Sequence, residues 1–262
     1  YMYRYNHANK QERAINVWPL NPAGSGVEVM KYRFNWNFPT FFSQHDPEKL
    51  YAFSNQVHVT KTEGQNWQTV SPDLTRAIPE TLKSSGGPIT QDNTGVECYG
   101  MIFAAAEHRP AQGLLWPGYE DGDFAPYLYK TTNYGKTWTK ITKGIEPLHF
   151  TRVVRADPER AGLLYAGTEY GMYVSFDDGG TWQPFQLNLP AVPITDLQVR
   201  DRNLIVATQG RSFWILDDLS PLHQLGDDVA GADFHLFAPK PSYRMRQNGR
   251  GERDPLLEGE NH

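Results

Sequence analysis

The side chains whose types suggest chemistry are a pair of carboxylates and a set of arginines. Asp92 and Glu97 lie five positions apart, and two carboxylates can divide the roles of general acid and general base. Arg33, Arg152 and Arg211 each lie beside a predicted strand, and three guanidinium groups together can grip a carboxylate ligand. The chain has 25 basic residues, so three arginines alone give that arrangement little support. Ordinary polar caps on a solvated loop are the simpler explanation of Asp92 and Glu97.

Metal and cofactor chemistry has no support in the sequence. The eight histidines are scattered, and neither H-x-x-x-H nor a Cys/His spacing occurs, so no metal site is predicted. Asp177 and Asp178 resemble part of a calcium loop, but a turn motif described below explains them more simply. The phosphate-binding, dinucleotide-binding and nucleophile-elbow motifs are also absent. We therefore expect no cofactor.

Composition narrows the fold class. A chain of 262 residues can bury a sizeable core, and all-β folds of this length often form one domain. The 14 Tyr, 13 Phe and 7 Trp favour strands over helices, and the 23 Gly and 19 Pro indicate many turns. These numbers predict an all-β domain made of many short strands.

Charge and hydropathy exclude several partners. The net charge of -5 is spread along the chain without a basic stripe, so no nucleic-acid partner is expected. No stretch approaches 18 apolar residues, so this chain contains no predicted membrane span. The single cysteine, Cys98, cannot form an internal disulfide, and the first residues do not resemble a signal peptide.

A sequence repeat indicates which elements position these residues. The segments TKTEGQNW, TTNYGKTW and SFDDGGTW, at residues 60–67, 131–138 and 175–182, share one pattern, and the third matches the Asp-box consensus S-x-D-x-G-x-T-W at every fixed position. In such a turn the Asp side chain accepts backbone hydrogen bonds and Gly supplies a positive φ, which predicts a structural and not a catalytic role. The predicted structural residues are Ser175, Asp177, Gly179, Thr181, Trp182, then Asn133, Gly135, Trp138, and in the degenerate first copy Gly64 and Trp67.

The flanks of the repeat predict the architecture. A D-P turn, an apolar strand and an alternating strand precede two of the turns, and a further strand follows the Trp, which makes four short strands per unit. This is the size of a blade, so we predict a β-propeller of four-stranded antiparallel blades with Asp-box hairpins. The predicted blades span residues 31–75, 95–145 and 149–190, with partial blades at 1–20 and 193–217.

These blades imply an incomplete ring of about four to five blades. The propeller segment is predicted to span residues 1–222, and residues 223–262 form a linker or tail. The rest of the ring is expected to come from missing sequence or from another chain. Residues 76–94 form a long predicted loop, and loops of this kind often carry function.

Several segments resemble one known group of proteins. The run VATQGRSFWILDDLSPL at residues 206–222 and the blade before it resemble large bacterial BNR-repeat proteins related to the sortilin-type propeller, which are often labelled glycosyl hydrolase or sialidase-like. The resemblance covers about residues 1–245 and implies a longer protein outside the cytoplasm, whether periplasmic, on the cell surface or secreted. The chain departs from the pattern at Trp116, which indicates either two fused blades or the absence of about one blade.

Propellers bind ligands at the mouth of the central channel, which directs attention to the ends of the inner strands. Besides Glu97, the candidate binding residues by this geometry are Arg33, Asn35, Trp36, Asp92, Asn93, Arg152, Thr195 and Asp196.

Two hypotheses of different class follow. The leading one is a non-catalytic module that binds a protein or peptide, or acts as a scaffold or a subunit of a larger assembly. The alternative is a carbohydrate-active hydrolase that binds a glycan and whose site is completed by other blades. A sialidase-like site would also require a Tyr nucleophile and an acid beside the arginines. A two-carboxylate hydrolase would require a matched pair about 5 to 9.5 Å apart.

Overall fold

The computed structural model describes residues 2–19, 24–75, 77–93, 100–102, 104–107, 114–119, 125–133 and 135–241, with backbone alone for residues 114–119 and 227. The chain divides into two compact units, Tyr1–Leu219 and Ser220–His262. The boundary predicted after residue 222 remains a proposal.

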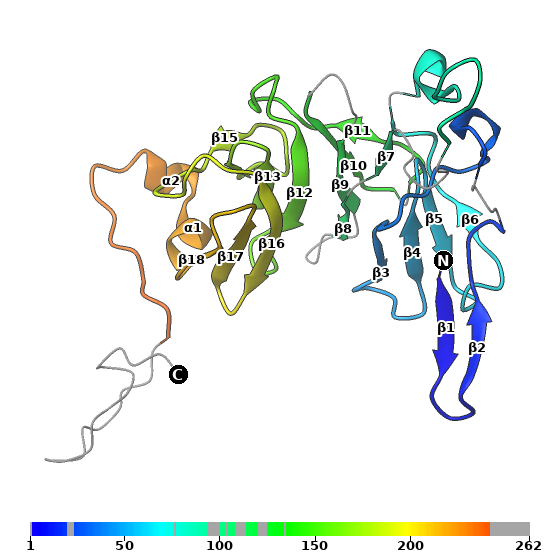
Figure 1. Cartoon of the computed structure of the whole chain (residues 1–262). Helices are drawn as coiled ribbons and strands as arrows, with labels where there is room; N and C mark the ends of the chain where they lie inside the picture. The colour runs from blue at the N-terminus through cyan, green and yellow to red at the C-terminus, as the bar shows by residue number, and fades with distance from the viewer. Residues whose placement is uncertain are drawn as a thin grey trace, which may run out of the picture. The chain divides into compact units, whose positions relative to one another are not determined.

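The first unit consists of five antiparallel sheets in its described residues (Figure 1). Two short 3-10 helices, Val27–Val29 and Pro79–Leu82, lie in its loops. A hairpin of β1 (Tyr3–Asn6) and β2 (Gln11–Ala14) comes first, and a sheet of β3 (Thr40–Phe42), β4 (Leu50–Phe53), β5 (Val57–Thr60) and β6 (Gln68–Thr69) follows. The next sheet contains β7 (Met101–Ile102), β8 (Ala106–Glu107), β9 (Leu114–Tyr119), β10 (Tyr127–Thr131) and β11 (Thr139–Lys140). The last two contain β12 (Thr151–Ala156), β13 (Leu164–Thr168), β14 (Met172–Ser175) and β15 (Gln183–Pro184), and then β16 (Ile194–Arg200), β17 (Asn203–Thr208) and β18 (Phe213–Leu216).

The strand order confirms the predicted fold class. Both the β3–β6 and the β12–β15 sheets are simple four-stranded meanders, in which each strand pairs with the next one along the chain. Such sheets are the blades of a β-propeller, and the described residues do not close a ring.

Three details differ from the sequence-based expectation. The strand predicted at the start of the 31–75 blade is only three residues long, because the Arg33 backbone N–H donates to the Asn55 side chain at 2.9 Å instead of to a neighbouring strand. In the 95–145 blade, β7 and β8 both pair with β9, so the inner strand is split into two pieces. Strand β9 also runs through Pro117 to Tyr119, where the sequence suggested an irregular joint.

Apolar clusters join neighbouring sheets. One cluster brings Leu128 and Ile141 of the β7–β11 sheet region together with Val154, Leu164 and Trp182 of the β12–β15 sheet region. A second packs Ile102, Tyr129 and Trp138 against buried side chains of the β3–β6 sheet, including Phe53. The aromatic residues of the repeat thus pack between adjacent blades, as propeller packing requires.

The three repeated turns share one hydrogen-bond pattern. In the third, Asp177 Oδ1 accepts from Ser175 Oγ and from the Thr181 backbone N–H, each at 2.8 Å. In the second, Asn133 Oδ1 accepts from the Thr137 backbone N–H at 2.9 Å, and in the first Thr62 Oγ1 accepts from the Asn66 N–H at 2.9 Å. The same turn therefore forms with Asp, Asn or Thr at its centre.

The Trp residues of two of the repeated turns also hydrogen-bond to the preceding sheet, at the residue that follows its last strand. Trp182 donates its indole N–H to the carbonyl oxygen of Ile141 at 2.7 Å, and Trp67 donates to that of Ile15 at 3.0 Å. Gly179 has φ +85° and lies so close to Ile141 that a Cβ would stand 2.5 Å from its Cδ1. The positive φ favours glycine there, and the approach to Ile141 means that the turn contacts the adjacent sheet as well as joining two strands.

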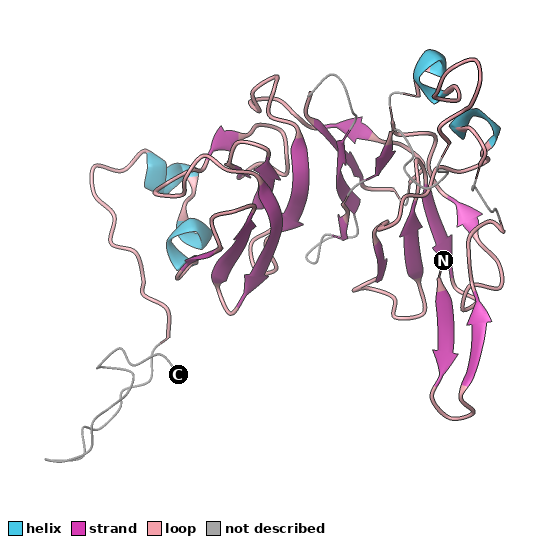
Figure 2. Cartoon of the chain, in the orientation of Figure 1, coloured by secondary structure: helices cyan, strands magenta, loops and turns pink. Residues whose placement is uncertain are grey.

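The second unit begins with two short helices, α1 (Ser220–Gln224) and α2 (Asp227–Ala230), which the sequence reasoning did not predict. The Gln224 side chain donates to the Ala238 carbonyl and accepts from its N–H, at 2.9 and 2.8 Å. Residues 231–241 contain no strand. Figure 2 shows how few helical turns the fold contains, and no helix in the described residues is long and apolar enough to cross a membrane.

Candidate functional site

A cavity of about 560 Å³ lies among the first strands of four sheets. Its lining residues come from positions 37–42 and 44, 104–107, 152–153 and 155–156, and 195–196, and we call it the inner-strand cavity. Strands β3, β8, β12 and β16 supply most of the lining, so this cavity faces the side on which a propeller has its channel.

Two ion pairs fix the cationic side chains of the cavity. Arg155 of β12 donates to Asp196 Oδ1 of β16 at 2.6 Å and to the Val154 carbonyl at 2.8 Å. Arg152 donates from Nε to Glu169 Oε2 at 2.5 Å. Burial lowers the pKa of the Arg155 guanidinium, and the negative charge of Asp196 acts in the opposite direction. Arg155 thus links two neighbouring sheets at the cavity wall.

A buried carboxylate forms another part of the wall. Glu107 of β8 is 8% exposed, and its two oxygens accept from Ser43 Oγ at 2.7 and 2.8 Å. Its Oε2 also accepts the Gln44 backbone N–H at 2.5 Å. These bonds tie the segment after β3 to the neighbouring sheet, so Glu107 acts first as a structural anchor.

The structure brings part of the predicted site together. Arg152, Thr195 and Asp196 all line the inner-strand cavity. Asn35 accepts the Trp36 backbone N–H at 2.6 Å, and neither residue belongs to the lining. Trp36 is nevertheless 69% exposed.

Asp92, the described member of the predicted carboxylate pair, does not line the cavity. Asp92 and Asn93 lie in a loop where the Asp92 N–H donates to the Ser85 carbonyl at 2.9 Å and the Asn93 side chain donates to Ser84 Oγ at 3.3 Å. Glu97 lies outside the described residues. A role for Asp92 and Glu97 as acid and base therefore remains a prediction.

The three arginines considered from the sequence have separate environments. Arg33 is 6% exposed and donates to Asp73 Oδ2 at 3.0 Å and to the Gly100 carbonyl at 3.0 Å, so it connects two sheets inside the core. Arg152 lines the cavity, and the exposed Arg211 donates to the carbonyl of Gly210. A shared carboxylate-binding triad does not form among them.

Sequence reasoning missed Glu107, Arg155 and the three phenylalanines Phe38, Phe41 and Phe42, which also line the cavity. The strand TRVVRA contained a usable signal. Arg152 and Arg155 are three positions apart, so regular alternation would place them on opposite faces of the strand, yet both line the cavity. Such a break in the period of two indicates a β-bulge, and the register of β12 shifts between Thr151 and Val153.

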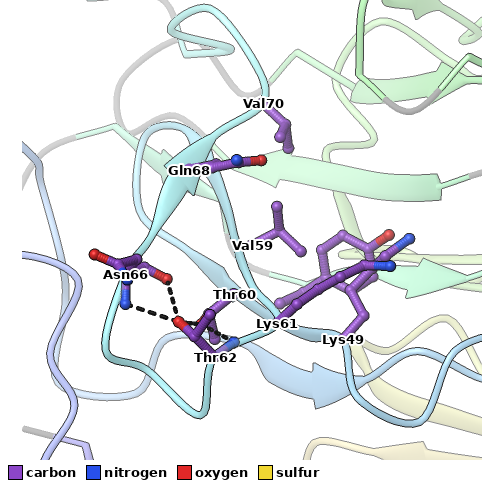
Figure 3. A pocket seen from close by; sticks show the side chains of 9 residues that line it. Lys49, Val59, Thr60, Lys61, Thr62, Asn66, Gln68 and Val70 are labelled. Atoms are coloured by element: carbon purple, nitrogen blue, oxygen red, sulfur yellow. Dashed lines mark hydrogen bonds between the residues drawn. The ribbon is translucent and has the colours of Figure 1, made fainter.

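A second pocket, of about 340 Å³, lies on the β3–β6 sheet (Figure 3). Lys49 and Lys61 stand on one side of it, and Thr62 and Asn66 of the first repeated turn stand on the other. Lys61 forms an ion pair with Asp46 at 2.6 Å. Within the described part of the chain, neither pocket contains three His, Cys, Asp or Glu side chains grouped as metal ligands.

Comparison with known proteins yields structural matches alone. No family model matches the chain, and no curated protein does. A GH74 xyloglucanase from Xanthomonas campestris superposes with a TM-score of 0.51 and 14% identity, over 81% of this chain and 32% of that chain.

Two further solved structures give lower TM-scores. The extracellular domain of BT4673 from B. thetaiotaomicron gives a TM-score of 0.49 with 11% identity, over 81% of this chain and 24% of that chain. YCF48 from Cyanidioschyzon merolae gives a TM-score of 0.42 with 16% identity, over 81% of this chain and 57% of that chain. The chain spans between 22% and 32% of the three GH74 enzymes it matches. At such identities the comparisons establish one property of this chain, its β-propeller fold.

Proposed function

We propose that this chain is part of a non-catalytic β-propeller that works outside the cytoplasm and binds a protein or peptide segment in the inner-strand cavity. The observation that carries the proposal is the Arg155–Asp196 ion pair, which joins two sheets at the cavity wall. Asp196 remains 62% exposed in its side chain, so it presents a fixed carboxylate to a ligand without being sealed off from it. A preformed polar group beside exposed aromatic surface is a typical peptide-binding arrangement.

The hydrogen bonds of the cavity carboxylates favour binding over catalysis. Both oxygens of Glu107 accept bonds from the segment after β3, and Asp196 Oδ1 also accepts the Leu197 N–H at 2.8 Å. These bonds commit the carboxylate oxygens to contacts within the protein. We infer that these groups hold the shape of the cavity. We further propose that the repeated turns are Asp-box hairpins, because their hydrogen bonds need an acceptor at the Asp position in each copy.

One observation favours a carbohydrate-active hydrolase as the alternative. The cavity combines Phe38, Phe41 and Phe42 with the two carboxylates of Glu107 and Asp196, and sugar sites commonly pair aromatic faces with carboxylates. In that case blades outside this chain would complete the site.

The test presents the full-length protein with two sets of ligands. A glycan panel is monitored for reducing ends, and an array of synthetic peptides is monitored for saturable binding. We expect no glycan turnover. For the best peptide on the array, we expect Arg155→Gln to weaken binding at least tenfold, because it releases the ion pair that shapes the cavity. Arg200→Gln is the matched control, since Arg200 is 71% exposed and lies at the far end of β16.

Glycan turnover that disappears in both Glu107→Gln and Asp196→Asn would overturn the binding proposal and support the hydrolase. Equal peptide binding by the Arg155 and Arg200 variants would place the peptide site elsewhere on the protein.

A further inference from the structure

The outer edge of β18 differs from the outer edges of the β3–β6, β7–β11 and β12–β15 sheets. The β3–β6, β7–β11 and β12–β15 sheets each end in a short outer strand, whereas the β16–β18 sheet ends at its third strand. In the described part of the chain, no strand pairs with the open side of β18. This sheet is therefore a blade whose fourth position is unfilled by the described residues.

The three outer strands follow one rule of attachment. The residue after each of them donates its backbone N–H to a carbonyl within the first two residues of the third strand, from Val70 to Val57 at 2.8 Å, from Ile141 to Leu128 at 2.7 Å and from Phe185 to Met172 at 2.8 Å. The pairing registers make Phe213 of β18 the equivalent of Met172, since Gly167 pairs with Met172 and Ala207 pairs with Phe213. A fourth strand on β18 would donate to the carbonyl of Phe213.

The same alignment explains why two apolar side chains of β18 are exposed to solvent. Met172 and Val174 are 3% and 2% exposed, but their equivalents Phe213 and Ile215 are 75% and 59% exposed. Because the Thr208 N–H donates to the Ser212 carbonyl at 3.2 Å, alternation makes Val206–Trp214 and Leu204–Leu216 the hydrogen-bonded pairs. The N–H and C=O of Phe213 and Ile215 are therefore directed to the open side. The edge thus offers two donors and two acceptors beside two apolar side chains.

The composition of the edge points to a pairing role. The outer strands of the complete blades are two residues long and polar or Pro-containing, with the sequences QT, TK and QP. Short, charged or Pro-bearing edges are how proteins prevent unwanted pairing. Strand β18 reads FWIL over four residues and carries no such protection.

We propose that the edge of β18 binds an extended peptide from a partner protein, which adds as the antiparallel fourth strand of this blade. Main-chain hydrogen bonds to Phe213 and Ile215 would hold it, and one apolar side chain would sit beside Phe213. Arg211 and Asp217 flank β18 and are exposed, so the geometry selects a peptide that is basic before its apolar residues and acidic after them. This inference concerns a different surface from the inner-strand cavity and stands without it.

A segment of the chain itself supplies the peptide that tests this proposal. Residues 136–143, KTWTKITK, fill the equivalent slot of the β7–β11 sheet, where Ile141 is the donor. Replacing the last lysine by glutamate gives KTWTKITE. In the proposed pairing its first residue, Lys, would lie beside Asp217 and Asp218, and its last residue, Glu, would lie beside Arg211. Its binding to the full-length protein is measured by fluorescence anisotropy. A control peptide, ETWTKITK, has the two ends exchanged.

We expect saturable binding of KTWTKITE and at least threefold weaker binding of the control peptide. Ile215→Pro should weaken binding at least tenfold, because proline removes the outward N–H while leaving the ladder to β17 intact. Ile215→Thr keeps that N–H and should change binding less than threefold. Equal affinity of the Pro and Thr variants, or absence of saturable binding, would overturn the proposal.

Hydrogen exchange of the unchanged protein gives a second test that does not depend on the folding of a variant. The amides of Phe213 and Ile215 should exchange rapidly in the free protein and become protected when KTWTKITE is added. Protection of both amides before any peptide is added would mean that another segment of the protein already occupies the edge, and the proposal would be wrong. Because the cavity variants leave β18 unchanged, failure here is distinguishable from failure of the cavity proposal.

Discussion

The β12–β15 and β3–β6 sheets share one strand order, yet only the second carries the pocket of Figure 3. Their registers align Tyr165 with Tyr51, since the pairs are Tyr165 with Val174 and Tyr51 with Val59. Around Tyr165 the chain supplies Leu163, Phe176 and Phe185, whereas the positions around Tyr51 hold Lys49, Lys61 and Val70. Burial raises the pKa of the Tyr165 hydroxyl, which donates to Asp157 at 3.2 Å.

This difference separates two roles within one repeat. Backbone pairing and the turn hydrogen bonds are retained in both sheets, so they build the blade. The side chains on the face of the blade vary, so that a position sealed by aromatic residues in one sheet becomes a polar pocket in another. Function in this fold accordingly depends on face and edge residues more than on the repeat itself.

The largest expected contrast between the two sheets concerns the repeated Trp. Trp182 is 4% exposed and belongs to the apolar cluster between sheets, whereas Trp67 is half-buried. Trp182→Ala should lower the free energy of unfolding by about 3 to 5 kcal/mol, because it leaves a cavity in a packed core. Trp67→Ala should lower it by less than half as much. Urea denaturation of the two variants measures both values, and equal losses would contradict the contrast drawn here.

A second contrast concerns pH. His58 occupies the position of Tyr173, is fully buried, and hydrogen-bonds through Nε2 to Ser54 Oγ at 2.8 Å. Burial lowers the pKa of His58 from 6.5 to about 4. The unfolded chain therefore binds more protons between these values, and the contribution of His58 to stability should fall by about 3 kcal/mol as the pH drops from 6.5 to 4 and then stay constant.

The control for this prediction is His58→Gln, which keeps a hydrogen-bonding side chain but does not titrate. Denaturation curves at several pH values should lose that part of the slope in the variant. An unchanged slope would assign the pH dependence to other groups.

The smallest expected effect comes from repairing the degenerate turn. Asp177 accepts from both the N–H and the hydroxyl of Thr181, at 2.8 and 2.7 Å, whereas Thr62 has one oxygen for this purpose. Replacing Thr62 by Asp and Asn66 by Thr in one variant should raise the free energy of unfolding by about 0.5 to 1 kcal/mol. Asp177→Ala should lower it by about 1 kcal/mol. A melting temperature that falls in the Thr62/Asn66 variant would contradict a shared turn geometry.

The fold was predictable because its determinants are local and repeated. The Trp and Gly of each turn occur at fixed spacing, and the alternating strands around residues 149–190 identify a blade without any long-range information. The predicted cavity residues Arg152, Thr195 and Asp196 followed from the same rule, which places functional groups at the ends of inner strands.

The rest of the site could not be predicted, because it depends on which segments meet. Glu107 joins the cavity through Ser43, a residue 64 positions away, and Arg155 through Asp196, 41 positions away. Arg33 had the right residue type, but it lies outside β3, and the acceptors that draw it into the core lie 40 and 67 positions further along. Residue type alone does not distinguish a core cation from a ligand-binding one.

The bond from Trp182 to the carbonyl of Ile141 gives this chain a direction of assembly. Trp182 binds a carbonyl that the preceding sheet provides, so during synthesis this partner is available before the hairpin itself emerges from the ribosome. A blade emerging from the ribosome finds its neighbour already formed, and folding should proceed as a series of short additions from the amino terminus. A circular permutant that begins within residues 149–190 would reverse that order for one blade and should fold more slowly while reaching the same final structure.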